Sequence, residues 1–506
     1  MVDFNKNKLF YLNTKTIKML VALIFWTCLL INLANQQVRG QTSTDVEEKI
    51  VRLLKEAVTF RNNGELEKAL SSFNEIIRIN PNIPETYFHL AITLNLKKDP
   101  KGAINNYNKA ISLRPSYPEA YNNLGGIYRN AKDFETAYTN FKQAIKLKAD
   151  FAEAYLNCAL TNLARSRFDD AKIEIDKAIE LKTDIAEAYF VRGEIFRKTL
   201  QLDLAISDFN KAVSINPDYG LGYFARASTY YQKGLKDEAI SDFTQSIKLN
   251  YALAKAYVGR GLCYYLRGEF DKSIADYTEA IRLDPKETGS YVGRGNAYFL
   301  SRELEKAVTD LDEAIRLNPN LAEAYYNLGL VQKAQGKYDK AIASEDMAIK
   351  LNPNYPEAYL IRANAHIQKG ELDKGLSDLE EVIKLDPNYP EAYNNRGLVY
   401  GKKGELKKAL SDYTKAISLQ PNDPVTYNNR AAIYIKENNF DKAMEDLTQA
   451  IKLNPNVSAY YYTRGLIYKL KNDKDKAIAD FRMVVKLKGD PMAVEQLNML
   501  GIKDVQ

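Results

Sequence analysis

The feature that most constrains this chain is a pattern of small and apolar residues that repeats every 34 residues. One copy lies between Pro390 and Asp423, and apolar side chains recur in both of its halves at intervals of three and four residues, the period of an amphipathic helix. Gly404 separates the halves, where a glycine can take the left-handed conformation that ends a helix, and Pro421 stops the second half. The copy therefore predicts a hairpin of two helices.

Thirteen such copies follow one another from Ile50 to Pro491 without an insertion or a deletion. Position 8 of every copy is Gly or Ala, and position 20 is Ala except at Ser273 and Gly375. Small residues at two fixed positions let the helices of a hairpin approach closely. Because neighbouring units of a repeat array bury their apolar faces against each other, we expect one elongated domain and no separate globular domains.

This arrangement resembles the tetratricopeptide repeat family over residues 50–491, although position 4, Trp or Leu in the family, is mostly Tyr here. The resemblance implies an all-α fold, an α-solenoid whose helix-turn-helix hairpins form a right-handed superhelix. It also implies that the chain binds other proteins. Residues 41–49 are expected to be a polar lead-in, and residues 492–506 a C-terminal capping helix and tail.

The first forty residues, 1–40, have the features of an export segment. Four lysines precede an apolar run at 19–31, which suits a secretory signal peptide and is short for a spanning helix of about twenty residues. Val38 and Gly40 are small residues suited to cleavage, and the alternative is that residues 17–34 remain as a membrane anchor. Both readings place the array outside the cytoplasm, in a periplasm, a lumen or the extracellular space.

Residue types that serve catalysis and metal binding are scarce. The two histidines, His89 and His366, lie in different repeats, and His366 occupies a position usually held by Tyr, which indicates a place in the core. Cys158 and Cys263 lie three repeats apart and are expected to be buried free thiols. No residues have the spacing of a metal site or of a nucleophile with its base. We therefore predict no enzyme, no cofactor and no metal; the rival class, an enzyme, would need a catalytic cluster on the inner face of the array.

The charge balance gives no indication of a nucleic-acid partner. Lys and Arg number 71 and Asp and Glu 65, which leaves a net charge of +6, and much of that excess lies in the first forty residues. Phosphate binding needs a basic stripe, and none stands out along the array. The expected partner is a protein or peptide, with membrane contact only through the N-terminal segment if it is uncleaved.

Eight repeats share Arg at position 7 and Asp at position 23, whereas the other five have neither. This co-occurrence predicts an ion pair within each of the eight hairpins, because a carboxylate that holds the guanidinium fork fixes the packing of two helices. The predicted pairs are Arg192 with Asp208, Arg226 with Asp242, Arg260 with Asp276, Arg294 with Asp310, Arg362 with Asp378, Arg396 with Asp412, Arg430 with Asp446, and Arg464 with Asp480.

Repeat 9, residues 322–355, departs from its neighbours. It has Leu328 and Ser344 in place of the ion pair, Gln332 at an aromatic position, and Glu345 where neighbouring repeats have Phe, Tyr or Leu. Because a carboxylate on a packed face needs a partner or exposure, repeat 9 is expected to be a weak joint or a contact point. The alternative is sequence drift without consequence.

The resemblance places positions 2, 5, 6, 9, 12 and 13 of each repeat on the inner, concave face, which we call the inner face. Asparagines at position 6 offer amides that can bond an extended peptide backbone: Asn123, Asn157, Asn327, Asn395 and Asn429. Aromatic residues form an apolar stretch between them: Phe190, Phe224, Tyr231, Tyr265, Phe299 and Tyr326. The alternative is that these amides are solvated and the rings pack against neighbouring helices.

These patterns predict a non-catalytic scaffold that holds partner proteins or extended peptides in the concave groove of the superhelix. An assembly or envelope-organising subunit, which acts through the ends and edges of the solenoid, is the alternative. The sequence does not identify the partner.

Overall fold

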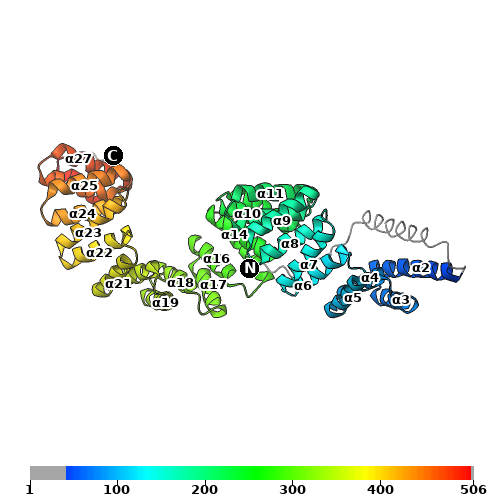
Figure 1. Ribbon diagram of the computed structural model, residues 1–506. Helices are drawn as coiled ribbons and strands as arrows, with labels where there is room; N and C mark the ends of the chain where they lie inside the picture. Colours follow the sequence, from blue (N-terminus) through cyan, green and yellow to red (C-terminus); the bar gives the residue numbers. More distant parts are fainter. Residues whose placement is uncertain (1–41, 503–506) are drawn as a thin grey trace. The chain divides into compact units, whose positions relative to one another are not determined.

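The computed structural model describes residues 42–502, and over this range the chain is helical and contains no strand (Figure 1). The export segment predicted at residues 1–40 lies outside the described residues. The chain divides after Gly222 into two compact units, which are described in turn.

The first unit consists of five helical hairpins. Its helices are α2 (Thr42–Asn62), α3 (Leu66–Ile79), α4 (Pro84–Leu96), α5 (Pro100–Leu113), α6 (Pro118–Asn130), α7 (Phe134–Leu147), α8 (Ala152–Ala164), α9 (Phe168–Leu181), α10 (Ala186–Lys198) and α11 (Leu202–Ile215). The segment called a polar lead-in is helical from Thr42, because it forms the first turns of α2.

The second unit continues the same register. Its helices are α12 (Gly220–Gln232, which begins just before the boundary), α13 (Lys236–Lys248), α14 (Leu253–Leu266), α15 (Phe270–Leu283), α16 (Thr288–Leu300), α17 (Leu304–Leu317), α18 (Ala322–Ala334), α19 (Tyr338–Leu351), α20 (Pro356–Gln368), α21 (Leu372–Leu385), α22 (Pro390–Lys403), α23 (Leu406–Leu419), α24 (Pro424–Lys436), α25 (Phe440–Leu453), α26 (Ser458–Leu470), α27 (Lys474–Lys488) and α28 (Pro491–Met499). The all-helical repeat fold is thus as predicted, with one hairpin per 34-residue copy.

The turn inside each hairpin requires a left-handed residue at position 15. Gly404 there has φ +80° and its amide bonds to the carbonyl of Tyr400, which closes α22. Seven copies have a side chain at this position and still take positive φ: Lys98, Lys132, Ser166, Leu200, Arg302, Asn438 and Asn472. The turn is therefore imposed by the packing of the two helices, and glycine is the residue that meets it without strain.

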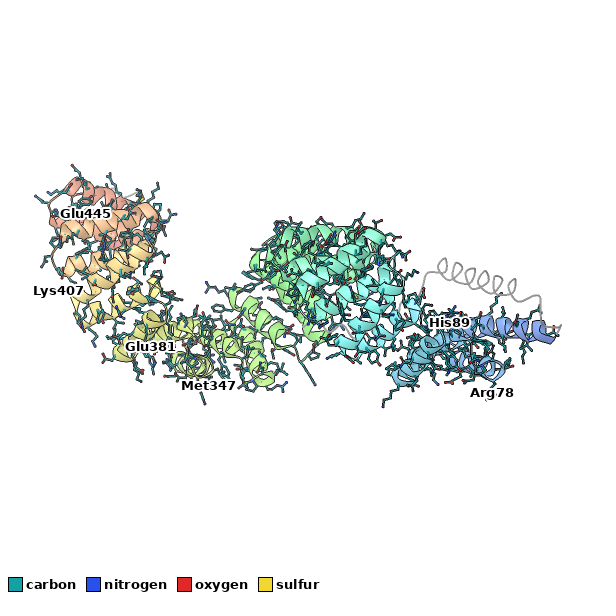
Figure 2. The ribbon with its side chains drawn as sticks, in the orientation of Figure 1. Arg78, His89, Met347, Glu381, Lys407 and Glu445 are labelled. Atoms are coloured by element: carbon teal, nitrogen blue, oxygen red, sulfur yellow. The ribbon has the colours of Figure 1, made fainter. Side chains whose placement is uncertain are left out.

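Small residues at position 8 make room for a large residue at position 24 of the same hairpin. The ring of Tyr413 is buried, and a Cβ added to Gly397 would lie 3.0 Å from it. A Cβ added to Gly125 would lie closer still to the buried ring of Phe141, at 2.7 Å. Second helices also carry exposed charges on their outer side, such as Lys407 (Figure 2). The hairpins of repeats 3 and 11 therefore have an apolar interior beneath a solvated outer face.

Candidate functional site

All eight predicted Arg–Asp pairs form, each within its own hairpin. In repeat 11, Arg396 Nε donates to Asp412 Oδ2 at 2.7 Å and Arg396 Nη2 donates to Asp412 Oδ1 at 2.8 Å. The other seven pairs make the same two bonds, at 2.6 to 2.9 Å. The Asp412 side chain is 8% exposed and the Arg396 side chain 20%, so each pair closes the interior of its hairpin.

The same arginines have further partners that the sequence reasoning missed. Arg430 lies 5.8 and 5.9 Å from the ring centroids of Tyr427 and Tyr434, one turn away on each side of it. Its Nη1 donates at 3.1 Å to Thr414 of the preceding repeat. The hydrogen bonds to Asp446 raise the pKa of the Arg430 guanidinium above its usual value. Six of these arginines, Arg192, Arg260, Arg294, Arg362, Arg430 and Arg464, therefore join their own two helices and also bond to the hairpin before them. A Thr or Asp sixteen residues earlier was the signal in the sequence.

In the first unit, the position-6 residue Asn157 bonds to other polar side chains of the inner face. Asn157 Nδ2 on α8 donates to Asn122 Oδ1 on α6 at 2.9 Å, and Arg129 Nη1 donates to Asn157 Oδ1 at 2.8 Å. Asn123 on α6 is half-buried. The Asn157 amide is thus fixed by its neighbours and is not merely solvated.

In the second unit, a chain of amides runs across α20, α22 and α24. Asn395 Nδ2 donates to Asn364 Oδ1 at 2.9 Å, and Asn394 Nδ2 donates to Asn395 Oδ1 at 3.1 Å. Asn429 Nδ2 donates to Asn394 Oδ1 at 3.0 Å. Asn428 is half-buried beside Asn429. The predicted Asn395 and Asn429 are therefore linked through Asn394. The amide chain extends over repeats 10 to 12.

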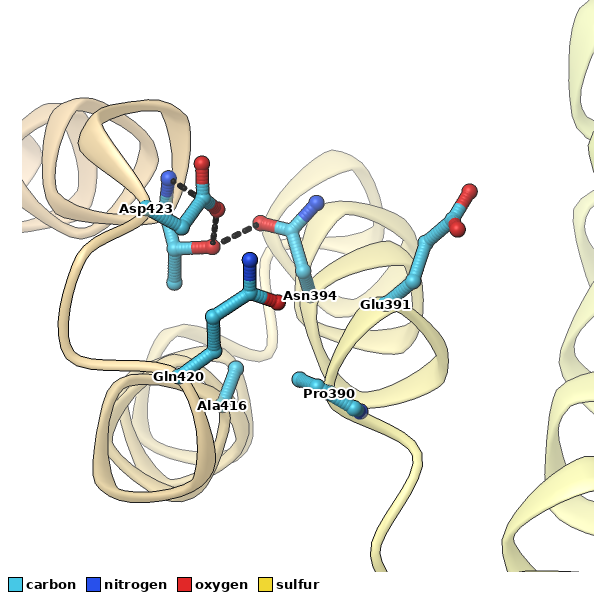
Figure 3. A pocket seen from close by; sticks show the side chains of 7 residues that line it. Pro390, Glu391, Asn394, Ala416, Gln420 and Asp423 are labelled. Atoms are coloured by element: carbon cyan, nitrogen blue, oxygen red, sulfur yellow. Dashed lines mark hydrogen bonds between the residues drawn. The ribbon is translucent and has the colours of Figure 1, made fainter. Parts of the chain in front are cut away.

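A pocket of about 220 Å³ opens beside this amide chain (Figure 3). It is lined by residues of α22, α23, the following turn and α24: Pro390, Glu391, Asn394, Ala416, Gln420, Asp423 and Thr426. Asp423 caps α24 by accepting the backbone N–H groups of Val425 and Thr426, and the Thr426 hydroxyl contacts Asn394 Oδ1 at 3.2 Å. The pocket is small and polar, which suits a polar side chain or a backbone amide.

The aromatic set divides into position-5 rings, which pack within their own repeats, and position-12 rings, which lie beside exposed leucines. Phe190 is 4% exposed, because its ring packs against Phe209 and Tyr219 of its own repeat at 5.7 and 5.5 Å. Phe224 packs in the same way against Phe243 and Tyr251, and Tyr326 against Tyr355. The expectation of an exposed aromatic wall is therefore corrected for Phe190, which is buried, whereas Phe224 and Tyr326 are half-buried between a hairpin and the loop that follows it.

The position-12 rings lie beside exposed leucines. Tyr231 on α12 is 37% exposed, and Tyr265 on α14 and Phe299 on α16 are half-buried. Leu266 and Leu300, each the next residue along, are 44% exposed. In repeats 6 to 8 the inner face of the second unit thus carries aromatic rings beside exposed leucines.

Both histidines are buried, each beside a charged side chain of its own unit. His366 is buried and its Nδ1 bonds to Glu371 Oε2 at 2.8 Å, in agreement with a core position. His89 is buried on α4 (Figure 2) with its Nδ1 3.1 Å from Arg61, and burial followed by the charge of Arg61 lowers its pKa to about 3. The imidazole of His89 is therefore neutral and accepts from Arg61.

Among residues 42–502, no group of His, Cys, Asp and Glu could hold a metal ion. In the same range, none of the helices combines the length and the apolar character that crossing a membrane requires. Cys158 and Cys263 are buried with free thiols, and burial raises the pKa of Cys263 to about 11.

The interior of repeat 9 is polar. Ser344 Oγ donates to Gln332 Oε1 at 2.9 Å, so these two residues form a neutral pair close to where other repeats have their ion pair. Glu345 is fully buried, and its two carboxylate oxygens have no partner among the described residues. Burial raises the pKa of Glu345 to about 9. Asn327 of the same repeat is also buried with its Nδ2 without a partner in the described chain.

Comparison with known families identifies the repeat. Two family models described as "Tetratricopeptide repeat" match residues 254–287, 322–355, 390–423 and 424–457, and residues 118–151, 186–219, 222–252 and 458–491. A third, described as "TPR repeat", matches residues 96–131, 295–336 and 363–404. The chain belongs to the tetratricopeptide repeat family. Its class is therefore that of the protein-interaction scaffolds that this family provides, which are generally non-catalytic.

Several solved structures are similar to this chain. A chain of the APC/C hetero-tetramer Cut9-Hcn1 has 16% identity and a TM-score of 0.43, over 90% of this chain and 98% of that chain. YrrB, described as a TPR protein with an unusual peptide-binding site, has 23% identity and a TM-score of 0.32, over 37% of this chain and 97% of its own. MamA has 28% identity and a TM-score of 0.30, over 32% and 94%. No curated protein matches significantly.

Proposed function

We propose that the chain is a non-catalytic scaffold that binds an extended peptide segment of a partner protein on the inner face of its repeats. The observation that carries this proposal is the amide chain of repeats 10 to 12, with the pocket beside it. Side-chain amides held in place by one another lose little conformational entropy on binding, so each further hydrogen bond to a partner contributes more of its energy.

The ends of the amide chain provide complementary groups for a peptide backbone. At one end, Asn364 accepts from Asn395, and its amide hydrogens have no partner among the described residues. At the other end, Asn429 donates to Asn394, and its oxygen has no partner in the same range. A backbone offers alternating N–H and C=O groups, which match a free donor and a free acceptor. We infer that the peptide crosses α20, α22 and α24 along this line.

We also propose that binding takes place outside the cytoplasm. The support is the pattern of four lysines and an apolar run in the first forty residues. Expression of the full chain with a C-terminal reporter, followed by fractionation and N-terminal sequencing, tests this location separately. A reporter that stays in the cytoplasm contradicts the location and leaves the peptide-binding proposal intact.

Affinity capture with the purified chain, followed by mass spectrometry, identifies the partner, and a double variant tests the surface. Asn395→Ala with Asn429→Ala is expected to weaken binding about tenfold or more, since it removes two of the amides that orient the others. The melting temperature is expected to fall by only a few degrees, because all these amides are half-buried. The exposed Asn422→Ala is the matched control. Unchanged binding in the double variant contradicts the proposed surface.

One observation favours the alternative role as an assembly subunit. The last hairpin and α28 expose Leu470, Met492 and Met499, which are 70%, 56% and 60% accessible. Apolar side chains gathered at the end of an array can contact a further protein. Met492→Ser with Met499→Ser is expected to abolish any concentration-dependent mass increase in sedimentation, whereas a wild-type chain that remains monomeric at all concentrations contradicts self-assembly through this end.

A further inference from the structure

Three arginines occupy position 12 of the inner face in the first unit, Arg61, Arg129 and Arg197, and they differ in what bonds to the Nε–Nη2 edge of the guanidinium. At Arg61, Nε and Nη2 donate to Asn62 Oδ1 at 3.4 and 3.3 Å. Arg197 on α10 donates from Nε to Glu194 Oε1 and from Nη2 to Glu194 Oε2, both at 2.8 Å. Glu194 lies three residues earlier, at position 9 of the same helix. A carboxylate of the chain itself therefore occupies the Nε–Nη2 edge of Arg197.

Arg129 on α6 lacks this carboxylate. Position 9 of its repeat is Gly126, and a Cβ added there would meet no atom within 4 Å, so the space beside the helix is open. The Arg129 side chain is held from the other side, where Nη1 donates to Asn157 Oδ1 and Asn157 in turn bonds to Asn122. Nε and Nη2 of Arg129 have no partner among residues 42–502.

The Arg129 guanidinium is buried without an ion pair, an environment that favours binding of an anion. Burial lowers the pKa of Arg129, which means that the cation is partly desolvated without an ion pair to compensate. The charged group within electrostatic reach is Glu187 on α10, whose own pKa is raised by burial and which forms no ion pair with Arg129 in the described chain. An unpaired cation of this kind is costly unless a ligand pairs with it.

We propose that Arg129, positioned by Asn157, binds the carboxylate of an acidic side chain in a partner protein, in the place that Glu194 occupies at Arg197. The Nε–Nη2 edge matches the two oxygens of a carboxylate, and the gap at Gly126 admits the side chain that carries it. A phosphate would bring more negative charge towards Glu187, so a carboxylate fits this site better. The inference rests on the proposed function, since it names the chemistry of the partner segment.

The test uses an array of decapeptides in matched pairs that differ only by Glu or Gln at one position, probed with the purified full chain. Wild type is expected to bind the Glu member about tenfold more tightly, as a charged hydrogen-bond pair implies. Gly126→Glu is expected to abolish that preference, because its own carboxylate then occupies the fork as Glu194 does at Arg197. Gly126→Ala is the matched control and is expected to keep the preference, since its Cβ meets nothing.

Two more variants sharpen the result. Glu194→Ala removes the carboxylate that bonds to Nε and Nη2 of Arg197. This variant is expected to bind peptides with two acidic residues more tightly, because Arg197 can then pair with the second one. Glu187→Gln removes the competing charge and is expected to strengthen binding of the Glu member. Circular dichroism melting of every variant identifies any that fail to fold.

The outcomes separate this inference from the proposed function. If wild type and Gly126→Glu both bind the Glu and Gln peptides equally well, the carboxylate site is overturned and the proposal of peptide binding stands. Tighter binding of phosphoserine members overturns the choice of a carboxylate. Absence of binding to every peptide overturns both proposals.

Discussion

The hairpins of repeats 9 and 11 lie in the same unit, and their second helices, α19 and α23, have the same length of 14 residues, but their interiors differ. At position 24, repeat 11 buries the ring of Tyr413 beside Gly397, whereas repeat 9 buries the carboxyl of Glu345 beside Gly329. Position 23 carries the ion-paired Asp412 in one and a hydroxyl in the other.

This difference shows which residues determine the backbone and which determine its stability. Both hairpins keep a fully buried Ala at position 20, Ala341 or Ala409, and a left-handed glycine in the turn, Gly336 or Gly404. The helix bounds follow those small residues. The ion pair and the large side chain at position 24 can both be absent, so they add stability and specificity to a hairpin that forms without them.

The largest effect expected from this comparison is a pH dependence confined to repeat 9. The folded-state pKa of Glu345 is raised from 4.5 to about 9, so its contribution to stability is fully present below pH 4.5 and is lost as pH rises towards 9. The facing charges are Lys333 and Arg362, which oppose the shift, and Asp346, which adds to it. Between pH 5 and pH 8 the free energy of unfolding should fall by up to about 4 kcal/mol relative to Glu345→Gln.

Urea denaturation of wild type and of Glu345→Gln at pH 5 and pH 8 measures this difference, because every other titrating group is common to both proteins. The two proteins are expected to converge at pH 5 and to separate at pH 8, with wild type the less stable. Parallel stability curves would show that the carboxyl is ionised and compensated in the folded state.

The second prediction removes the ion pair from repeat 11. Asp412→Ala leaves Arg396 without its carboxylate inside the hairpin and is expected to cost about 3 kcal/mol, at the low end for a buried pair because Arg396 is one-fifth exposed. Ser344→Ala in repeat 9 is the control and removes one neutral hydrogen bond, worth about 1 kcal/mol. Hydrogen exchange of the backbone amides of α19 and α23 measures the loss of stability in both variants. An equal loss of stability in the two repeats contradicts a special role for the ion pair.

Much of this architecture could be predicted because it depends on spacing along one chain. The helix bounds follow the 34-residue register, and Arg396 pairs with Asp412 because positions 7 and 23 face each other across a hairpin in every copy. Co-occurrence of the two residue types was enough to indicate that contact.

The details of the inner face could not be predicted, because they depend on which rotamer a side chain takes among several neighbours. Phe190 is turned inward by the rings of Phe209 and Tyr219, and periodicity alone does not distinguish that ring from the exposed Tyr231. The open fork of Arg129 is visible only in comparison with Arg197, although Gly126 at position 9 was a signal in the sequence.

The smallest effect concerns the glycines at position 8. Gly397→Ala is expected to change stability by less than about 1 kcal/mol, because the gain in helix propensity offsets a small shift of the Tyr413 ring, 3.0 Å from the added Cβ. Gly329→Ala is expected to lose about 1 kcal/mol, since its Cβ would lie 2.1 Å from Oε1 of the fully buried Glu345, which must move to admit it. Urea denaturation at pH 6 compares the two. Equal losses would mean that the carboxyl of Glu345 relocates freely, and the interior of repeat 9 would then differ from that of repeat 11 in charge alone.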